Sequence, residues 1–155
     1  MATTATTAQS FSDLTLKIEE EIHVQASLDQ TFEALLEQLG AENIGAEGKP
    51  MPMKIEAWPG GRWFRDLGDN NGHLWGHVQA IKRPTLLEIC GPLMLSFPVY
   101  SNVQYRLSEV DGGTLIKFHH LGLGFVPDNY RAGLGSGWKS IQDRIRKAAE
   151  AKRPR

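Results

Sequence analysis

His120 is the residue of this sequence whose type and position are most suggestive of chemistry. Ile116, Phe118 and His120 occupy every second position of one segment, and a period of two places them on one face of a strand. The two apolar residues make that face the interior one. An inward imidazole could hydrogen-bond a ligand or act as an acid–base group near neutral pH. The alternative is a structural histidine, satisfied by a backbone carbonyl or a tyrosine, while His119 faces outward.

Two other polar side chains are predicted on inward strand faces. Glu20 interrupts the apolar side of an alternating segment, residues 14–25, where a buried carboxylate needs a partner. It either pairs with an inward base across the sheet or returns to solvent through a β-bulge. Tyr105 has apolar residues two positions away on each side, so it is expected inside. Both side chains could help His120 to orient a bound molecule.

Aromatic side chains are expected around the same interior. Phe118, Trp138 and one of the neighbours Trp63 and Phe64 would form an aromatic wall. Either these rings fill a packed core or they surround a cavity, and the sequence leaves both alternatives open. The candidate ligand-binding residues are His120, Tyr105, Phe118, Trp63, Trp138 and Glu20.

The remaining candidates for chemistry do not form a site in the sequence. His73 and His77 have the spacing of a helical metal pair, but on a strand their Cα atoms would be about 13 Å apart. No metal is therefore expected, and no cofactor. Cys90 lies in an apolar run and is interpreted as a structural thiol. The chain has no phosphate-binding, dinucleotide-binding or serine-nucleophile motif, which favours a binding protein over an enzyme.

Length and composition are those of one soluble globular domain. Apolar residues make up 41% and charged residues 23% of 155 positions, and no apolar run is long enough for a membrane span. Residues 1–12 are predicted to be a flexible tail without signal-peptide character, and residues 13–152 a single domain. One cysteine excludes an intrachain disulfide and suggests a reducing cytoplasm.

The charge is unevenly distributed. The net charge is −1, but from Tyr130 onward eight Lys and Arg residues face two acids. Such a basic tail can indicate nucleic acid or a membrane surface. The simpler explanation is that cations near a helix C-terminus complement the helix dipole, so nucleic acid is not expected as a partner.

The predicted elements give the order strand, short helix or two, six strands, long helix. Ser27 and Gln30 form a capping-box pattern that opens a helix ending near Gly40. Short turn-rich links between the strands predict an antiparallel meander. An apolar stripe predicts a helix over residues 130–152, and its three early glycines suggest a start near Ser136. The strands are expected at residues 14–25, 53–58, 62–67, 73–83, 86–91, 99–110 and 114–122.

Several segments, in this order, resemble the START/birch-allergen-like (SRPBCC) superfamily. They are residues 26–32 (ASLDQTF), 59–63 (PGGRW), 75–78 (WGHV) with 83–84 (RP), 113–120 (GTLIKFHH) and 137–138 (GW). The nearest branch is similar to the C-terminal domain of the activator of heat-shock-protein-90 ATPase. Trp58 departs from that pattern, since the family often has a basic residue there.

The resemblance implies an α+β helix-grip fold, in which about seven curved antiparallel strands wrap around the long C-terminal helix. It also implies a hydrophobic or amphipathic small molecule, bound in a cavity between sheet and helix. One alternative is an enzyme of the cyclase or hydratase kind that uses the same cavity. Another is a chaperone-interaction module, and a homodimer is a further option.

Overall fold

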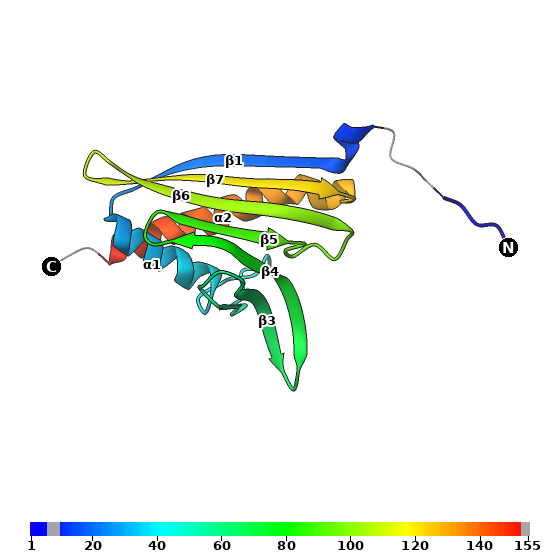
Figure 1. The fold of residues 1–155 in the computed structure, drawn as a ribbon, viewed down its shortest axis with the longest axis horizontal. Coiled ribbons are helices and arrows are strands. Elements are labelled where there is room, and N and C mark those ends of the chain that lie inside the picture. The colour runs from blue at the N-terminus through cyan, green and yellow to red at the C-terminus, as the bar shows by residue number, and fades with distance from the viewer. Residues whose placement is uncertain (6–9, 153–155) are drawn as a thin grey trace.

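A curved antiparallel sheet wraps around a long C-terminal helix in the structure, a computed structural model that describes residues 1–5 and 10–152 (Figure 1). The sheet order is β1-β7-β6-β5-β4-β3-β2, so the chain order is a meander apart from β1, which joins the far edge. The strands are β1 (Thr15–Val24), β2 (Lys54–Ile55), β3 (Arg62–Gly68), β4 (Asn71–Lys82), β5 (Leu86–Gly91), β6 (Val99–Val110) and β7 (Gly113–Gly124). The predicted fold class is confirmed.

The first helix, α1 (Leu28–Leu39), follows β1 and begins as its sequence predicts. The Ser27 hydroxyl accepts a hydrogen bond from the Gln30 backbone N–H at 3.2 Å, and the Gln30 side chain accepts one from the Ser27 N–H. This capping box satisfies two backbone donors that the first turn of a helix leaves free. The buried side of α1 carries Phe32, Leu35 and Leu39, which face the sheet.

Two segments at the N-terminal half differ from the sequence prediction. The strand expected at residues 53–58 is only the two residues of β2, since Pro52 and Pro59 flank the segment and offer no N–H for a ladder. Phe11–Leu14, partly assigned to the flexible tail, form a short 3-10 helix. The tail prediction also covers residues 6–9, which lie outside the described residues.

The C-terminal helix, α2 (Asp128–Ala151), begins earlier than its glycines suggest. The expected start near Ser136 is wrong because the Pro127 carbonyl accepts hydrogen bonds from the N–H groups of Tyr130 and Arg131, at 3.0 and 3.1 Å. Burial of one stripe stabilises the helix in spite of the glycines. That stripe consists of Leu134, Trp138, Gln142, Ile145 and Ala149.

Arg131 ties the N-terminal end of α2 to β1. Its guanidinium donates hydrogen bonds to the backbone carbonyls of Thr15 at 2.8 Å, Asp13 at 2.6 Å and Val126 at 3.1 Å. A planar guanidinium with several fixed donors suits this role better than a lysine ammonium would. The arginine therefore joins the start of the sheet to the start of the helix.

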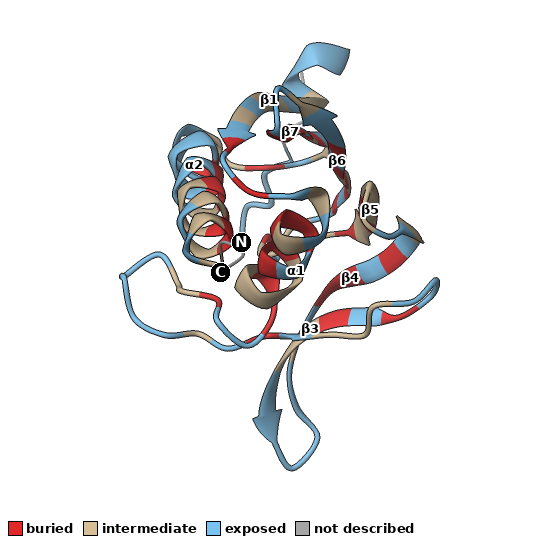
Figure 2. Cartoon of the chain, turned by 90° about the vertical axis from the view of Figure 1, so that its left-hand side faces the viewer, coloured by how far each residue is buried: buried red, intermediate tan, exposed pale blue. Residues whose placement is uncertain are grey.

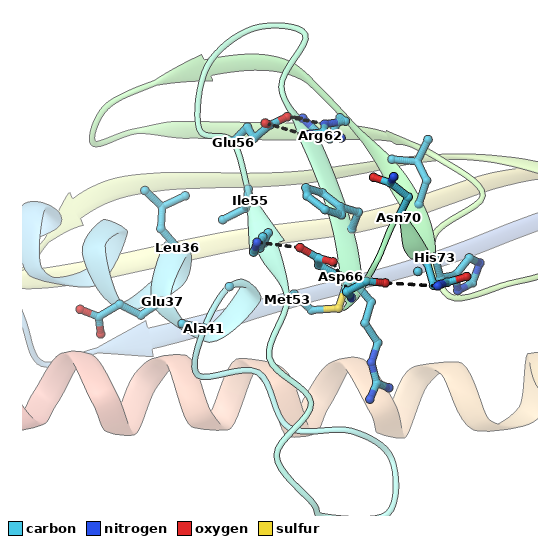
Figure 3. Close-up of a pocket in the computed structure, with 18 of the residues that line it drawn as sticks. Leu36, Glu37, Ala41, Met53, Ile55, Glu56, Arg62, Asp66, Asn70 and His73 are labelled. Atoms are coloured by element: carbon cyan, nitrogen blue, oxygen red, sulfur yellow. Dashed lines mark hydrogen bonds and ion pairs between the residues drawn. The ribbon is translucent and has the colours of Figure 1, made fainter.

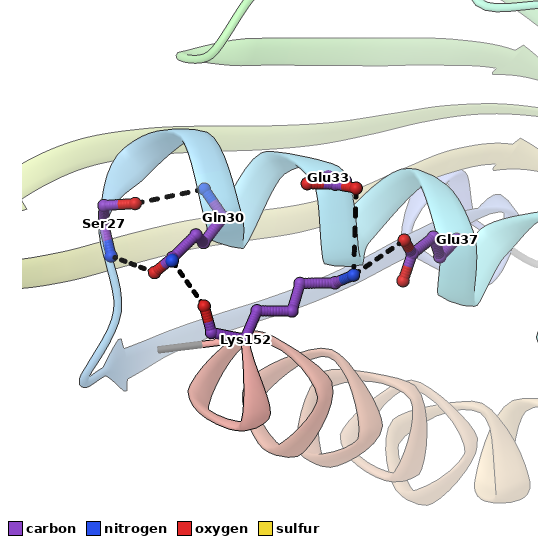
Figure 4. Close-up of polar contacts among 5 residues, drawn as sticks. All are labelled: Ser27, Gln30, Glu33, Glu37 and Lys152. Carbon is purple, nitrogen blue, oxygen red and sulfur yellow. Dashed lines mark hydrogen bonds and ion pairs between the residues drawn. The ribbon is translucent and has the colours of Figure 1, made fainter. Parts of the chain in front are cut away.

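Lys152 ties the other end of α2 to α1 (Figure 4). Its ammonium lies 2.9 Å from a Glu37 carboxylate oxygen, and the Gln30 side chain donates to the Lys152 carbonyl. The Glu37 hydrogen bond raises the pKa of Lys152. Six residues before Lys152, Arg146 pairs with Glu150 at 3.9 Å. Part of the positive charge near the C-terminus is therefore paired with acidic side chains of the same domain.

The core lies between the concave side of the sheet and the two helices (Figure 2). Buried residues of both helices face the strands and one another, whereas the far end of the β3–β4 hairpin projects from the body as exposed chain. None of the described helices is long and apolar enough to cross a membrane.

Gly135 offers a test of whether the early glycines lower the stability of α2. A Cβ atom at Gly135 would meet nothing within 4 Å, and alanine favours a helix over glycine by about 1 kcal/mol. We therefore expect Gly135→Ala to raise the free energy of unfolding by about that amount, measured by urea denaturation. As a control, Gly61→Ala should be destabilising, because its Cβ would lie 1.9 Å from the Glu56 carbonyl oxygen. A destabilised Gly135→Ala would show that the glycine is needed for the conformation of α2.

Candidate functional site

His120 lies inside the fold with both ring nitrogens occupied by protein groups. The Trp138 indole N–H donates to Nδ1 at 3.0 Å, so Nε2 carries the proton and donates to the Ser101 hydroxyl oxygen at 2.8 Å. The side chain is fully buried, and burial lowers the pKa of His120 to about 4. The imidazole is therefore neutral at pH 7, and this arrangement favours the structural alternative over ligand contact. Its partners, however, are Ser101 and Trp138 rather than the expected backbone carbonyl or tyrosine.

Tyr105 and Glu20 belong to a second polar chain, through Gln142 of α2. The Tyr105 hydroxyl donates to the Gln142 side-chain oxygen at 2.9 Å, and the Gln142 amide donates to a Glu20 carboxylate oxygen at 3.4 Å. Burial raises the pKa of the tyrosine. The register of β1 against β7 is continuous, so the bulge alternative for Glu20 is wrong. Its partner is an amide of the terminal helix rather than a base.

The predicted aromatic wall is split into two groups. Phe118 lies between Tyr105 and Trp138, with ring centroids 4.9 and 4.8 Å away. Trp63 is the inward member of its pair, but it packs on Trp75 at 5.0 Å and donates to the Leu39 carbonyl at 2.8 Å, at the end of α1. The structure thus brings five of the six candidate residues together and places Trp63 in another part of the core.

The space between sheet and α2 is occupied by these contacting side chains. A hollow of about 1170 Å³ lies elsewhere, between the C-terminal end of α1, the edge strand β2 and the β3–β4 hairpin (Figure 3). A cavity was predicted between the sheet and the terminal helix, but the hollow lies at the β2 edge of the sheet instead. We call this hollow the edge groove. The reason is volume: Trp138, Phe118 and Tyr105 fill the space that smaller side chains would leave open.

The edge groove has an apolar surface from three elements. α1 contributes Leu36, and β2 contributes Ile55, which is paired with the inward Trp63 and so lies on the core side of the sheet edge. Phe64 of β3 is paired with Lys54 and lies on the outer side of the same edge. Trp58 and Leu74 add further apolar area and are 58% and 45% exposed. Large side chains of this kind are the usual lining of a site for a small organic molecule.

One fixed ion pair lies at the turn between β2 and β3. The Arg62 guanidinium donates two hydrogen bonds to the two carboxylate oxygens of Glu56, at 2.8 and 2.9 Å. These bonds lower the pKa of Glu56 to about 2. The same guanidinium lies 4.4 Å from the centroid of the Phe64 ring, a favourable cation–π distance. The charges are therefore held in place against the apolar surface.

A second ion pair lies further along the groove. The Lys54 ammonium is 2.7 Å from an Asp66 carboxylate oxygen, and the Gly68 N–H donates to the other oxygen at 2.9 Å. Both contacts lower the pKa of Asp66. Sequence reasoning missed this groove, because α1 and the hairpin lie next to each other only in the folded chain. The one signal was Trp58, at a position where the resembled family often has a basic residue.

Other clusters of polar side chains are less suited than the edge groove to bind a small molecule or an ion. A hollow of about 480 Å³ lies over β1, β6 and β7 and is lined mainly by charged side chains, Glu19, Glu21, Arg106 and Lys117 among them. Within residues 1–5 and 10–152, no group of three His, Cys, Asp or Glu side chains is arranged to hold a metal ion. Cys90 is a half-buried free thiol that accepts a hydrogen bond from the Asn102 amide at 3.3 Å.

Solved structures with the same architecture cover most of the chain. CalU16 from Micromonospora echinospora superposes with a TM-score of 0.61 and 21% identity, over 86% of this chain and 75% of that one. Ara h 8.0201 gives 0.62 and 15%, over 89% and 99%. The chain has the helix-grip fold. A third helix-grip neighbour, MLL2253 from Mesorhizobium loti, gives 0.65 and 16% identity, over 89% and 99%.

Sequence comparison adds no relative to this list. No protein-family model matches the chain, and no curated protein matches it. At these identities the structural likeness establishes the helix-grip fold and leaves the ligand and the activity open.

Proposed function

We propose that this helix-grip protein binds an amphipathic small molecule in the edge groove. The observation that carries the proposal is a hollow of about 1170 Å³ whose apolar surface is bordered by two fixed ion pairs. An apolar body would lie against Phe64 and Leu74, which are directly opposite each other in the sheet register, and a polar end would meet Lys54 and Asp66 on the same face. Preformed concave sites with a mainly apolar lining and a few fixed polar groups are typical of small-molecule binding.

The charges of the groove indicate the kind of ligand. Lys54 and Arg62 are each paired with a carboxylate. The groove has no excess of positive charge to attract a strongly anionic molecule, because its lining has three basic residues, Lys54, Arg62 and Arg65, and four acidic ones, Glu37, Glu56, Asp66 and Asp69. A neutral or zwitterionic polar end would join these pairs without leaving an ion unpaired. DynU16, a protein in the dynemicin biosynthetic locus, is also a structural neighbour, with a TM-score of 0.59 and 18% identity over 89% of this chain and 48% of that one.

Catalysis has less support than binding. His73, the histidine that lines the edge groove, accepts the Trp75 indole N–H on Nδ1 at 3.0 Å. Glu56 and Asp66, which could serve as acids or bases, have lowered pKa values and stay ionised near neutral pH. A cyclase or hydratase would need a proton donor or acceptor with a pKa near the working pH. A role in chaperone interaction has no separate observation in its favour.

Phe64 gives the direct test of the groove. We expect N-phenyl-1-naphthylamine, an uncharged dye used as the probe, to bind wild-type protein and to quench Trp58, which is 58% exposed at the groove, whereas Trp63, Trp75 and Trp138 are buried. Phe64→Ser should weaken the affinity roughly tenfold, because removing a contacting phenyl ring costs about 1.5 kcal/mol or more. The measurement is a fluorescence titration.

Two further variants assign the signal to the groove. Trp58→Phe should keep the dye affinity and lose most of the quenched tryptophan emission. Tyr100→Arg, on the outer face of the sheet and outside the groove, should leave both affinity and quenching unchanged. Loss of dye binding in Tyr100→Arg, together with normal binding in Phe64→Ser, would refute the edge groove as the binding site.

A further inference from the structure

The end of β7 has an inverted pattern of burial. Leu121 and Leu123 point outward and are 39% and 51% exposed, and Phe125, two positions further, is 55% exposed. The inward positions between them are glycines. Gly124 needs to be one, because its φ is +137° and a Cβ would lie 2.2 Å from the Pro98 carbonyl oxygen. The strand therefore turns its large apolar side chains to solvent, opposite to the usual arrangement.

Neighbouring elements extend this apolar surface. Tyr100 of β6 is directly opposite Leu123 in the sheet register and is 60% exposed. Beyond the strand ends, the Phe97 ring lies edge-on to Phe125 at 6.4 Å and to Tyr130 of α2 at 4.9 Å. We call this surface the end patch. It consists of Phe97, Tyr100, Leu121, Leu123, Phe125 and Tyr130, and none of these lines the edge groove.

The end patch has the area of one side of a stable interface. Tyr100, Leu121, Leu123, Phe125 and Tyr130 are on average about half exposed, and side chains of roughly 200 Å² each would then leave about 500 Å² of mainly apolar surface. Patches of this size are at the upper end for a monomer. A standard interface covers about 800 Å² per partner, of which roughly 60% is apolar. The apolar area of the end patch therefore matches the apolar area of one side of a standard interface. Tyrosine and phenylalanine are also enriched at such interfaces.

The charges near the end patch favour a protein over a lipid surface. Lys17, opposite Leu121 in the register, pairs with Glu19 at 3.4 Å. Arg131, next to Tyr130, has its guanidinium on three backbone carbonyls, and Asp128 lies in the same helical turn. Attraction to an anionic membrane depends on free basic side chains around the apolar residues. The end patch instead has a balanced rim.

We propose that the end patch binds a second copy of this chain, so that the protein is a symmetric homodimer through β6, β7 and the start of α2. A two-fold interface brings the same patch together from both subunits. A patch with an apolar centre and charges of both signs at its rim can match itself across a two-fold axis, because a cation of one subunit can face an acid of the other. The edge groove lies outside this interface and stays open in both subunits. A result that contradicts the dimer therefore does not contradict the proposed ligand site, and the reverse also holds.

Sedimentation equilibrium of the full chain tests the proposal. Wild type should fit a monomer–dimer equilibrium with dimer dominant at about 200 µM. Leu123→Glu should shift dissociation at least tenfold towards monomer, because a carboxylate would be buried without a partner. Tyr130→Glu, on a different element, should do the same, and an acidic residue in the first turn of α2 is compatible with the helix dipole. Urea midpoints measured at a dilution where wild type is monomeric should be the same for all three proteins, which shows that both variants are folded.

A matched control and a lipid-binding experiment give the results that would contradict the homodimer. Leu67→Glu, a leucine 63% exposed on the β3–β4 hairpin, should leave the dimer intact. A wild-type protein that is monomeric at about 200 µM, or a Leu67→Glu variant that dissociates as much as Leu123→Glu, overturns the homodimer. So does co-sedimentation of wild type, but not Leu123→Glu, with phosphatidylcholine vesicles containing phosphatidylserine, which would assign the end patch to a membrane surface.

Discussion

Trp138→Ala is expected to lower the free energy of unfolding by about 3–5 kcal/mol, the range for removing a large aromatic ring from a packed core. Trp138 is 1% exposed, and its ring centroid lies 4.8 Å from that of Phe118 and 5.8 Å from that of His120. The substitution removes these contacts and leaves the His120 Nδ1 acceptor without its donor. Urea denaturation followed by far-ultraviolet circular dichroism measures the loss.

Two companion variants separate packing from hydrogen bonding. Trp138→Phe keeps a ring near Phe118 but has no N–H, so its cost should be smaller, about 1–3 kcal/mol. Trp58→Ala removes a tryptophan that is 58% exposed and should change stability by no more than about 0.5 kcal/mol. If Trp138→Ala cost as little as Trp58→Ala, the packing of α2 against the concave side of the sheet would be refuted.

The parts of the fold that depend on local sequence were predictable. The capping box of Ser27 and Gln30 involves residues three apart, and it forms as expected. Alternation placed Phe118 and His120 inside because the side chains of a strand point to opposite faces in turn. The curved sheet around a long helix then followed from the number of strands and the one long amphipathic segment. Each inference used neighbours along the chain.

The parts that depend on distant partners were not predictable. Glu20 accepts a hydrogen bond from Gln142, 122 positions later, and no local pattern indicates such a pair. The early start of α2 reflects hydrogen bonds to the Pro127 carbonyl and contacts of Arg131 with carbonyls of Asp13 and Thr15. Together with burial of the apolar stripe, these outweigh the low helix propensity of its glycines. The same limit applies to the edge groove, since α1, β2 and the β3–β4 hairpin come together only through the fold.

Whether the interior is filled or hollow was open for a different reason. Alternation shows which face of a strand is inward, but the space left inside depends on how all inward side chains fit together. Phe118 is in contact with both Tyr105 and Trp138, and both nitrogens of His120 are occupied. Since the interior is packed in this way, the polar groups at its centre contribute mainly to the position of α2. Because the packed interior penalises a charged imidazole, the stability of the protein should depend on the protonation of His120.

Acidification is expected to destabilise the protein through His120, even before its carboxylates titrate. The folded-state pKa of His120 is about 4, against an ordinary value of 6.5, because burial penalises the imidazolium. The unfolded chain therefore binds a proton below pH 6.5 that the folded chain does not take up until about pH 4. Stability is full above pH 6.5 and falls as the pH drops, by about 2 kcal/mol between pH 7.5 and pH 5.

Urea midpoints of three proteins at pH 7.5 and pH 5 test the assignment to His120. Wild type should show the full decrease, whereas His120→Gln, although less stable at pH 7.5, should lose most of its pH dependence in this range. His119, the neighbouring titratable group that acts on His120, also has a pKa lowered by burial, so His119→Gln is the matched control and should keep most of the decrease. If His120→Gln declines as steeply as wild type, the imidazole is not the buried neutral group that joins Ser101 to Trp138, because only a group that resists protonation in the folded state makes stability fall in this direction.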